Sequence, residues 1–409
     1  MKGIRSPFVI RKTRQQHPLW RKRQPLLSQL DIELTERCNN NCIHCCINLP
    51  AANRSTRIRE LDTTQWESIL RQAADLGALT VRFTGGEPLL RKDFPDLYII
   101  ARKLGLKVLL FTNARLIDAK LAHLFIRIPP LERIEVTVFG LTRKSYETVT
   151  KVHGSFLEFQ KGVRLLEENR IPFIIKGVYL PANADEVNQI EAWAAALPWM
   201  EHPPDFSLLM ELRGRRDSPA KNRSLLKLRS SPETAVTFMR RHEKKNMPGM
   251  ASFCERFVGI KGDILFSCGA GTGGCVDAYG RWQPCLSLRH PDLTYDLLKG
   301  SLEDALTRHF PTLKGMKAQN PDFLQRCARC FLRGLCEQCP AWSWSEHGNL
   351  DTPVEYLCQI AHAWAHHLGI LAAGEKSWEI QDASQRIISW AKNRSSIQGN
   401  REGKSPGKK

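Results

Sequence analysis

Short apolar runs alternate with longer amphipathic segments over the first half of the chain. The short runs predict six strands, at residues 30–34, 79–83, 107–112, 133–139, 171–179 and 206–212. The longer segments predict helices at residues 64–76, 94–104, 117–126, 156–169 and 185–197. Alternating units of this length favour a parallel sheet with helices outside it, so the pattern predicts an α/β fold with a partial (β/α)6 TIM-type barrel.

Residues that commonly begin or end helices support several of these boundaries. Gly77 and Gly105 follow two of the helices, and Ser155 has the side chain to cap the helix that begins at 156. Residues 231–245 predict one more helix, which would bridge to a second domain. Beyond Gln381 the chain is rich in Ser, Gly and Lys, and we expect a disordered tail there.

Three cysteines follow the first predicted strand at a C-x-x-x-C-x-x-C spacing, as Cys38, Cys42 and Cys45. In a barrel, ligands bind at the carboxyl ends of the strands, where this loop falls. Three thiolates suit an iron-sulfur cluster with one iron left open. A zinc site or three buried free thiols would also fit a short triplet of this kind.

Composition limits the setting of this site. The chain has thirteen cysteines, an odd count, and its first 25 residues are basic and lack the apolar segment of a signal peptide. No apolar run approaches the length of a membrane span. We therefore expect a cytoplasmic protein without a membrane segment, in which clustered cysteines are metal ligands rather than disulfides.

The formal charge of +18 raises the possibility of nucleic-acid binding. Much of the excess lies near the two ends, within residues 11–23 and 401–409, and no recognition motif accompanies it. Metal-bound thiolates add negative charge that the formal count omits. The charge therefore favours an acidic peptide or protein partner over a nucleic acid.

A Gly-Gly-Glu-Pro turn, residues 85–88, ends the second predicted strand. Two glycines let a backbone approach a ligand closely, and the proline fixes the exit from the turn. An ordinary tight loop would have the same composition. Its place beside the cysteine loop favours the ligand interpretation.

The cysteine motif resembles the signature of the radical SAM superfamily, in which the residue before the last cysteine is usually aromatic; here it is His44. The resemblance implies a [4Fe-4S] cluster on Cys38, Cys42 and Cys45, with S-adenosylmethionine on the open iron. Reductive cleavage would give a 5'-deoxyadenosyl radical that takes a hydrogen atom from the substrate. The cofactor-binding residues implied by the family motifs are His44, Gly85, Gly86, Glu87 and Thr137. Thr137 belongs to Thr-Val-Phe-Gly, where relatives often have Ser-x-Asp-Gly or Ser-x-Tyr-Gly, and it keeps the hydroxyl near the ribose.

A second field of cysteines begins in a glycine-rich, loop-dense region after Cys254. Taken alone, the block from Cys327 to Cys339 would suit a zinc ribbon. The whole series resembles the SPASM extension, C-x(9 to 15)-G-x4-C, a gap, C-x2-C-x5-C-x3-C, a gap, C. The one departure is that two residues, rather than three, separate Cys336 from Cys339.

By this resemblance the second field holds two auxiliary [4Fe-4S] clusters. One would be bound by Cys268, Cys275, Cys285 and Cys339, and the other by Cys327, Cys330, Cys336 and Cys358. If Cys275 is not a ligand, the first auxiliary cluster has an open iron. Cys46 and Cys254 are left over, and we expect them to be packing residues or spare thiols.

The resemblances imply five regions and one function. The regions are a basic N-terminal extension (1–26), a radical SAM core (27–225), a bridging helix (226–253), a SPASM domain (254–370) and a C-terminal helix with a basic flexible tail (371–409). The function would be an oxidoreductase that modifies or crosslinks a peptide or small protein, with the auxiliary clusters in electron transfer. An external donor such as a flavodoxin or ferredoxin would supply electrons. No catalytic acid or base is named, because hydrogen-atom abstraction needs none.

Three alternatives stay open. A radical SAM oxidase or decarboxylase of a small molecule or tetrapyrrole would carry the same motifs. Sulfatase maturation is less favoured, because Leu286 stands where those relatives have an Asp after the Cys285 position. A zinc-binding nucleic-acid protein would explain the CxxC pairs and the charge, but it leaves the Cys38 triplet and the Gly85–Pro88 turn unexplained.

Overall fold

The computed structural model describes residues 27–399 apart from 244–246, 248–249, 252–253 and 255–261. The predicted N-terminal extension therefore lies outside the described residues, as do parts of the bridging region and the last ten residues. The chain divides into two compact units. The first unit combines residues up to Leu228 with Gly269–Leu313, and the second combines Arg229–Cys268 with residues from Lys314 onward.

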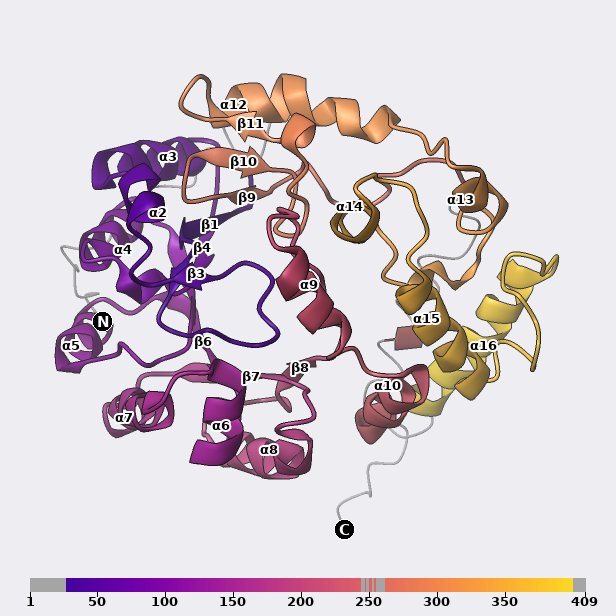
Figure 1. Cartoon of the computed structure of the whole chain (residues 1–409), viewed down its shortest axis with the longest axis horizontal. Helices are drawn as coiled ribbons and strands as arrows, with labels where there is room; N and C mark the ends of the chain where they lie inside the picture. The colour runs from indigo at the N-terminus through magenta and orange to yellow at the C-terminus, as the bar shows by residue number, and fades with distance from the viewer. Residues whose placement is uncertain (1–26, 244–246, 248–249, 252–253, 255–261, 400–409) are drawn as a thin grey trace, which may run out of the picture. The chain divides into compact units, whose positions relative to one another are not determined.

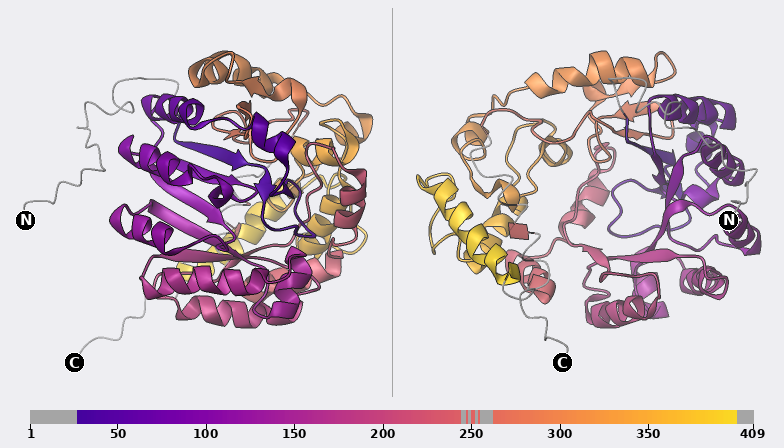
Figure 2. Two further views of the ribbon diagram at one scale, coloured as in Figure 1. Left: turned by 60° about the vertical axis from the view of Figure 1, so that its left-hand side comes forward. Right: turned by 180° about the vertical axis from the view of Figure 1, so that it is seen from behind.

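The first unit is built on one sheet in the order β11-β10-β9-β1-β4-β5-β6-β7-β8. Its six consecutive parallel strands are β1 (Gln29–Thr35), β4 (Thr80–Gly85), β5 (Lys107–Thr112), β6 (Leu131–Val138), β7 (Phe173–Val178) and β8 (Asp205–Ser207). The helices on the outer side of this curved sheet are α3 (Thr63–Asp75), α4 (Phe94–Lys103), α5 (Ala119–Arg127), α7 (Ser155–Glu168) and α8 (Val187–Ala196) (Figures 1 and 2). The predicted partial (β/α)6 barrel is therefore confirmed.

Alternation along the strands separates an apolar face from a polar one. Leu30, Ile32 and Leu34 of β1 are buried, and the first two are in register with the buried Val81 and Phe83 of β4. The intervening residues are charged: Asp31 pairs with Arg82 of β4 at 2.7 Å. Because successive side chains point to opposite faces, one face packs on the helices and the other lines the barrel with polar groups.

The sixth strand is shorter than the sequence predicts. β8 covers only Asp205–Ser207, whereas the prediction ran to residue 212. Its three residues pair with Lys176–Val178, where β7 ends, so no neighbouring backbone is available to extend the ladder. The elements that the sequence did not predict include two short helices of the barrel, α2 (Arg54–Arg59) and α6 (Arg143–Thr150).

The predicted helix boundaries were right in most respects. Gly77 and Gly105 adopt positive φ after their helices, at 96° and 85°. The cap at Ser155 was wrong: Gly154, at φ 80°, is the N-cap residue, and Ser155 is the first residue of α7. The Ser155 hydroxyl instead lies 2.8 Å from that of Thr150, which joins α6 to α7.

The three remaining strands of the first unit come from the cysteine-rich part of the chain. β9 (Cys275–Val276) pairs with β1 in parallel, and β10 (Arg281–Gln283) and β11 (Tyr295–Asp296) continue the sheet by antiparallel pairing. This pairing explains why Gly269–Leu313 belongs to the first unit. The domain boundaries at residues 226, 254 and 371 stay predictions.

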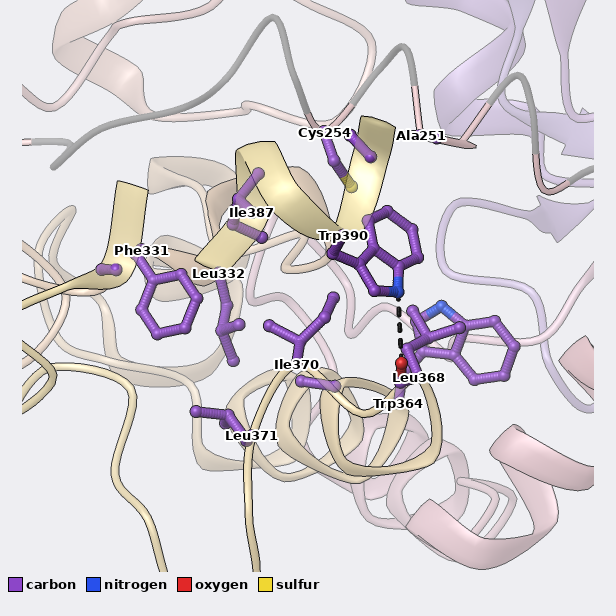
Figure 3. Packing of buried hydrophobic residues seen from close by; sticks show 13 residues of the cluster. Ala251, Cys254, Phe331, Leu332, Trp364, Leu368, Ile370, Leu371, Ile387 and Trp390 are labelled. Carbon is purple, nitrogen blue, oxygen red and sulfur yellow. Dashed lines mark hydrogen bonds between the residues drawn. The ribbon is translucent and has the colours of Figure 1, made fainter. Parts of the chain in front are cut away.

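The second unit has its own apolar core. α10 (Pro232–Met239), α15 (Glu355–His367) and α16 (Ala383–Gly399) contribute to it, together with Cys254 and Phe331 (Figure 3). The indole Nε1 of Trp390 donates to the carbonyl of Leu368 at 3.1 Å. The expectation of a disordered tail beyond Gln381 was therefore wrong for residues 383–399, because Ile387 and Trp390 give α16 a buried face. The rest of that predicted tail, 400–409, lies outside the described residues.

Candidate functional site: a three-cysteine loop at the mouth of the barrel

The cysteine loop leaves the carboxyl end of β1 and is closed by a small parallel sheet. β2 (Arg37–Cys38) pairs with β3 (Leu49–Pro50), so residues 39–48 form a loop with both ends fixed. Arg37 anchors this sheet by a bidentate ion pair with Glu60, with both contacts at 2.8 Å. The loop is therefore attached to the rigid sheet rather than free at the surface.

The three cysteines of the loop lie close enough together for their thiols to affect one another's pKa. Cys38 and Cys42 are buried and Cys45 is half-buried. Burial, with smaller contributions from Glu87 and the Cys45 thiol, raises the pKa of Cys38 to about 12. Burial and then the thiols of Cys45 and Cys38 raise the pKa of Cys42. Without a cation, gathering three thiolates here is unfavourable; a bound metal cluster reverses that preference, so the site fits an iron-sulfur cluster.

Backbone N–H groups point at two of the sulfurs. The N–H of Asn40 donates to Sγ of Cys38, and the N–H of Asn48 donates to Sγ of Cys45, each at 3.4 Å. Such bonds stabilise negative charge on sulfur. The loop conformation is therefore suited to thiolates.

The Gly-Gly-Glu-Pro turn lies directly against the start of the cysteine loop. A Cβ on Gly85 would lie 2.2 Å from the carbonyl oxygen of Thr35, and one on Gly86 would lie 2.2 Å from that of Arg37. The N–H groups of Gly86 and Glu87 donate to these same two carbonyls, at 2.7 and 2.9 Å. The glycines thus permit close approach between two chain segments, while their contact with a ligand stays a prediction.

Glu87 joins the ends of two neighbouring strands. Its Oε1 accepts from the Thr112 hydroxyl at 2.9 Å and from the N–H of Leu89 at 3.1 Å, and its Oε2 accepts from the N–H of Asn113 at 2.8 Å. Burial raises the pKa of Glu87 to about 7 despite these hydrogen bonds. A carboxylate has about four acceptor positions, so Oε2 keeps one for a further donor.

His44 and Thr137 lie near the same mouth. The His44 ring packs on Phe139 with the ring centroids 5.4 Å apart, and burial lowers the pKa of His44 to about 4. Its Nδ1 is buried and has no hydrogen-bond partner among the described residues. Thr137, in β6, is half-buried and in register with Lys176 of β7. Phe139, which departs from the family motif, serves as the packing surface for His44.

Lys176 lies in β7 with its side chain half-buried. In the structure its Nζ pairs with Glu135 of β6 at 2.7 Å and lies 5.1 Å from the centroid of the Phe111 ring. Glu135 is buried. Lys176 therefore belongs to the polar lining of the barrel.

Charged residues that were not among the predicted site residues extend this lining. Arg289 pairs with the fully buried Glu33 of β1, and Arg215 pairs with Glu36 and, at 3.1 Å, with Asp277. The Tyr279 hydroxyl also lies 2.7 Å from Glu36. The acidic residues at alternate positions of the first strand were the sequence signal for this polar lining. Their arginine partners come from distant segments of the chain, so no local pattern predicts the ion pairs.

Four cysteines of the second unit are gathered in the same manner. Cys327, Cys330, Cys336 and Cys358 are the predicted ligands of one auxiliary cluster. Burial raises the pKa of Cys336, and the thiols of Cys330, Cys358 and Cys327 raise it further. Cys358 also lies 3.6 Å from Nη2 of Arg326 and from Nδ1 of His362. The structure thus brings this set together; its ligation of a cluster stays a prediction.

The other predicted set is divided between the units. Cys275 and Cys285 belong to the first unit, and Cys268 and Cys339 to the second. Cys275 is fully buried in β9, where it pairs with Asp31, and its register partner on β10, Gln283, lies two residues before Cys285. The assignment of these four to one cluster, with or without Cys275, stays a prediction.

Within the described residues, no group of three or more His, Cys, Asp or Glu is placed to hold one metal ion. No helix in the described part of the chain has the length and apolar character to cross a bilayer.

Comparison with known proteins identifies the family of this chain. Residues 32–194 match the model of the radical SAM superfamily. The PqqA peptide cyclase of Xanthomonas euvesicatoria pv. vesicatoria is 30% identical over 258 residues, which cover 59% of this chain and 68% of that enzyme. The chain therefore belongs to the radical SAM superfamily and is a radical SAM enzyme.

Two solved structures show the same fold. The enzyme anSMEcpe with bound AdoMet and the Cp18Cys peptide aligns with a TM-score of 0.53 at 17% identity, over 90% of this chain and all of that one. SuiB from Streptococcus suis, bound to S-adenosylmethionine, aligns with a TM-score of 0.52 at 16% identity, over 81% and 77% of the two chains. The chain thus shares its overall fold with these two proteins.

Proposed function

We propose that this chain is a radical SAM oxidoreductase that modifies or crosslinks a peptide or small protein, with two auxiliary [4Fe-4S] clusters in electron transfer. The observation that supports it most is the gathering of Cys38, Cys42 and Cys45 beside a Gly-Gly-Glu-Pro turn at the barrel mouth. The PqqA peptide cyclase supports a peptide as the substrate class.

Different residues at the mouth would bind the cluster and S-adenosylmethionine. Cys38, Cys42 and Cys45 would hold the cluster, and the free acceptor position on Glu87 would take the amino group of S-adenosylmethionine. When bound, these groups supply one-electron cleavage to a 5'-deoxyadenosyl radical and abstraction of a hydrogen atom from the substrate. His44, Gly85, Gly86 and Thr137 would border the bound cofactor. The polar lining around Glu33 and Glu36 would then face the substrate.

The gathered thiols of the second unit support the electron-transfer part of this proposal. Four thiolates fill all the protein positions of a [4Fe-4S] cube. A cluster on Cys327, Cys330, Cys336 and Cys358 would therefore have no open iron and would carry electrons rather than bind substrate. A flavodoxin- or ferredoxin-like donor would reduce the cluster at the mouth.

The thiol chemistry supports a reducing compartment. All thirteen cysteines lie in the described part of the chain, and eleven of them belong to the proposed cluster-ligand sets rather than to disulfides. Free clustered thiols persist where glutathione and thioredoxin keep them reduced. We therefore place the enzyme in the cytoplasm.

Iron content tests the number of clusters. The protein would be purified without oxygen, reconstituted, and analysed for iron and sulfide. Three [4Fe-4S] clusters require about twelve irons per chain. Cys336→Ala should lower this to about eight, whereas Cys46→Ala should leave it unchanged, because Cys46 lies outside the predicted ligand sets. About four irons in both the wild type and Cys336→Ala would contradict the auxiliary clusters.

Mass spectrometry tests the substrate class. Peptides encoded by short genes beside this one would be incubated with the reconstituted enzyme, S-adenosylmethionine and a reductant. A crosslink or oxidation removes two hydrogens, so we expect a loss of about 2 Da from one such peptide and not from the Cys42→Ala reaction. Turnover of a small molecule with no effect on any peptide would contradict the peptide assignment.

A further inference from the structure

Two cations approach the cysteine loop from different elements. Arg115, just after β5, is buried, and its Nη1 contacts the carbonyl of Asn39 and Oδ1 of Asn40. Its Nε and Nη2 bind Glu158 at 2.9 and 2.6 Å. The guanidinium is therefore held in one orientation beneath the loop by a carboxylate of α7.

The second cation comes from the segment after the last barrel strand. Lys221 lies in the first turn of α9 (Pro219–Leu226), where Oγ of Ser218 accepts its N–H at 3.3 Å. The N–H of Arg213 donates to Oδ1 of Asn222 at 3.0 Å, which fixes this helix to the strand-end segment before it. Nζ of Lys221 donates to Oδ1 of Asn48. Within the described residues Lys221 forms no ion pair with a carboxylate.

The two asparagines that these cations contact are also the residues whose backbone N–H groups donate to the cysteine sulfurs. Asn40 donates its backbone N–H to Cys38, and Asn48 donates its own to Cys45, each at 3.4 Å. Nδ2 of Asn48 donates to the carbonyl of Asn40 at 3.2 Å, and both asparagines are buried. A continuous path thus runs from one cation through two amides to the other. We call these four residues, Arg115, Asn40, Asn48 and Lys221, the asparagine clamp.

The charge on Lys221 needs an anionic counterpart. A neutral donor would satisfy Oδ1 of Asn48 without the cost of half-burying an ammonium group. Burial lowers the pKa of Lys221, and the thiols of Cys45, Cys42 and Cys46 act in the opposite direction. The acidic groups close to this lysine are therefore the thiols of the loop.

The reduction potential of an iron-sulfur cluster depends on hydrogen bonds to its sulfurs, on net charge and on exposure. Reduction adds one negative charge, which N–H donors and nearby cations stabilise. We propose that the asparagine clamp holds the N–H···S bonds on Cys38 and Cys45 and, with its two positive charges, raises the reduction potential of the cluster that these cysteines bind. This inference rests on the proposed function, since it requires that cluster.

The test is a redox titration of the reconstituted full chain. Electron paramagnetic resonance would follow the reduced cluster whose signal changes when S-adenosylmethionine is added, which separates it from the auxiliary clusters. At a fixed potential, Lys221→Met and Arg115→Met should each lower the ratio of reduced to oxidised cluster about tenfold, which is about 59 mV for one electron. Lys221→Arg should stay within about threefold of the wild type, because it keeps the charge.

Two further variants serve as controls. Lys227→Met removes an exposed lysine at the C-terminal end of the same helix and should leave the ratio unchanged. Lys221→Gln keeps a donor for Asn48 but removes the charge, so it gives the answer if a methionine variant fails to load iron. We expect its ratio to fall as well.

The outcomes separate this inference from the proposed function. Wild-type ratios in fully loaded Lys221→Met and Arg115→Met, or in Lys221→Gln, would overturn the clamp and leave the enzyme assignment intact. A wild-type protein without any signal that responds to S-adenosylmethionine would instead overturn the proposed function itself.

Discussion

The carboxylate of Glu87 accepts the backbone N–H of Asn113 at 2.8 Å, so one side chain ties the turn after β4 to the end of β5. Burial raises the pKa of Glu87 to about 7. As the pH falls through 7, the carboxylate gains a proton and loses the negative charge that an ammonium group requires. The affinity for S-adenosylmethionine should therefore decrease below pH 7 by up to about tenfold per pH unit.

Glu87→Gln tests this pH dependence. We expect weaker binding of S-adenosylmethionine by the reconstituted variant and a flat profile between pH 6 and 8, measured by equilibrium dialysis. The exposed Glu168 supplies a control, as Glu168→Gln should keep the wild-type profile. An unaltered profile in Glu87→Gln would show that Glu87 only joins the two strands.

A side chain at Gly86 would collide with the backbone at the start of the cysteine loop. The added Cβ would lie 2.2 Å from the Arg37 carbonyl oxygen and 2.7 Å from that of Glu36, both backbone atoms. Gly86→Ala should therefore displace the start of the cysteine loop and reduce both iron loading and S-adenosylmethionine binding at least tenfold. Gly315→Ala, with open space around the new Cβ, should have no effect on either. Normal loading of Gly86→Ala would contradict the close approach.

The buried ion pair between Arg289 and Glu33 fixes β1 to the cysteine-rich segment of the first unit. Arg289→Met leaves an unpaired carboxylate with no exposed surface, which costs roughly 3–5 kcal/mol of unfolding free energy. Combining it with Glu33→Gln should recover much of this loss. Urea unfolding of the four proteins in a double-mutant cycle gives the coupling energy, and additive losses would show that the pair does not interact.

The sequence predicted the barrel well because its signals are local. The apolar alternation of β1, the glycines after α3 and α4, and the cysteine spacing each depend on a few neighbouring residues. The extent of β8 depends on where β7 ends, and the cap at Gly154 depends on a backbone angle, so neither has a local signal. The same holds for the site: the loop cysteines were found by spacing, whereas Arg115 and Lys221 reach Asn40 and Asn48 only through the fold.

The C-terminal helix shows the same limit. Ser and Lys dominate the composition after Gln381, but Ile387 and Trp390 fall on one side of α16 and are buried in the core of the second unit. Trp390→Ala should therefore destabilise that unit by roughly 3–5 kcal/mol. Ser389→Ala, at an exposed neighbouring position, should cost less than about 0.5 kcal/mol. Urea unfolding followed by far-UV circular dichroism measures both, and equal stabilities would contradict the packing of α16.

The most direct test of the account is the release of 5'-deoxyadenosine from S-adenosylmethionine by the anaerobic, reconstituted and reduced enzyme. Cys45 and Cys46 are adjacent, but only Cys45 is a proposed ligand of the cluster at the barrel mouth. We predict that Cys46→Ala releases 5'-deoxyadenosine at close to the wild-type rate, while Cys45→Ala releases none. Equal release by the two variants, or a wild-type protein that contains zinc and releases none, would contradict the central claim.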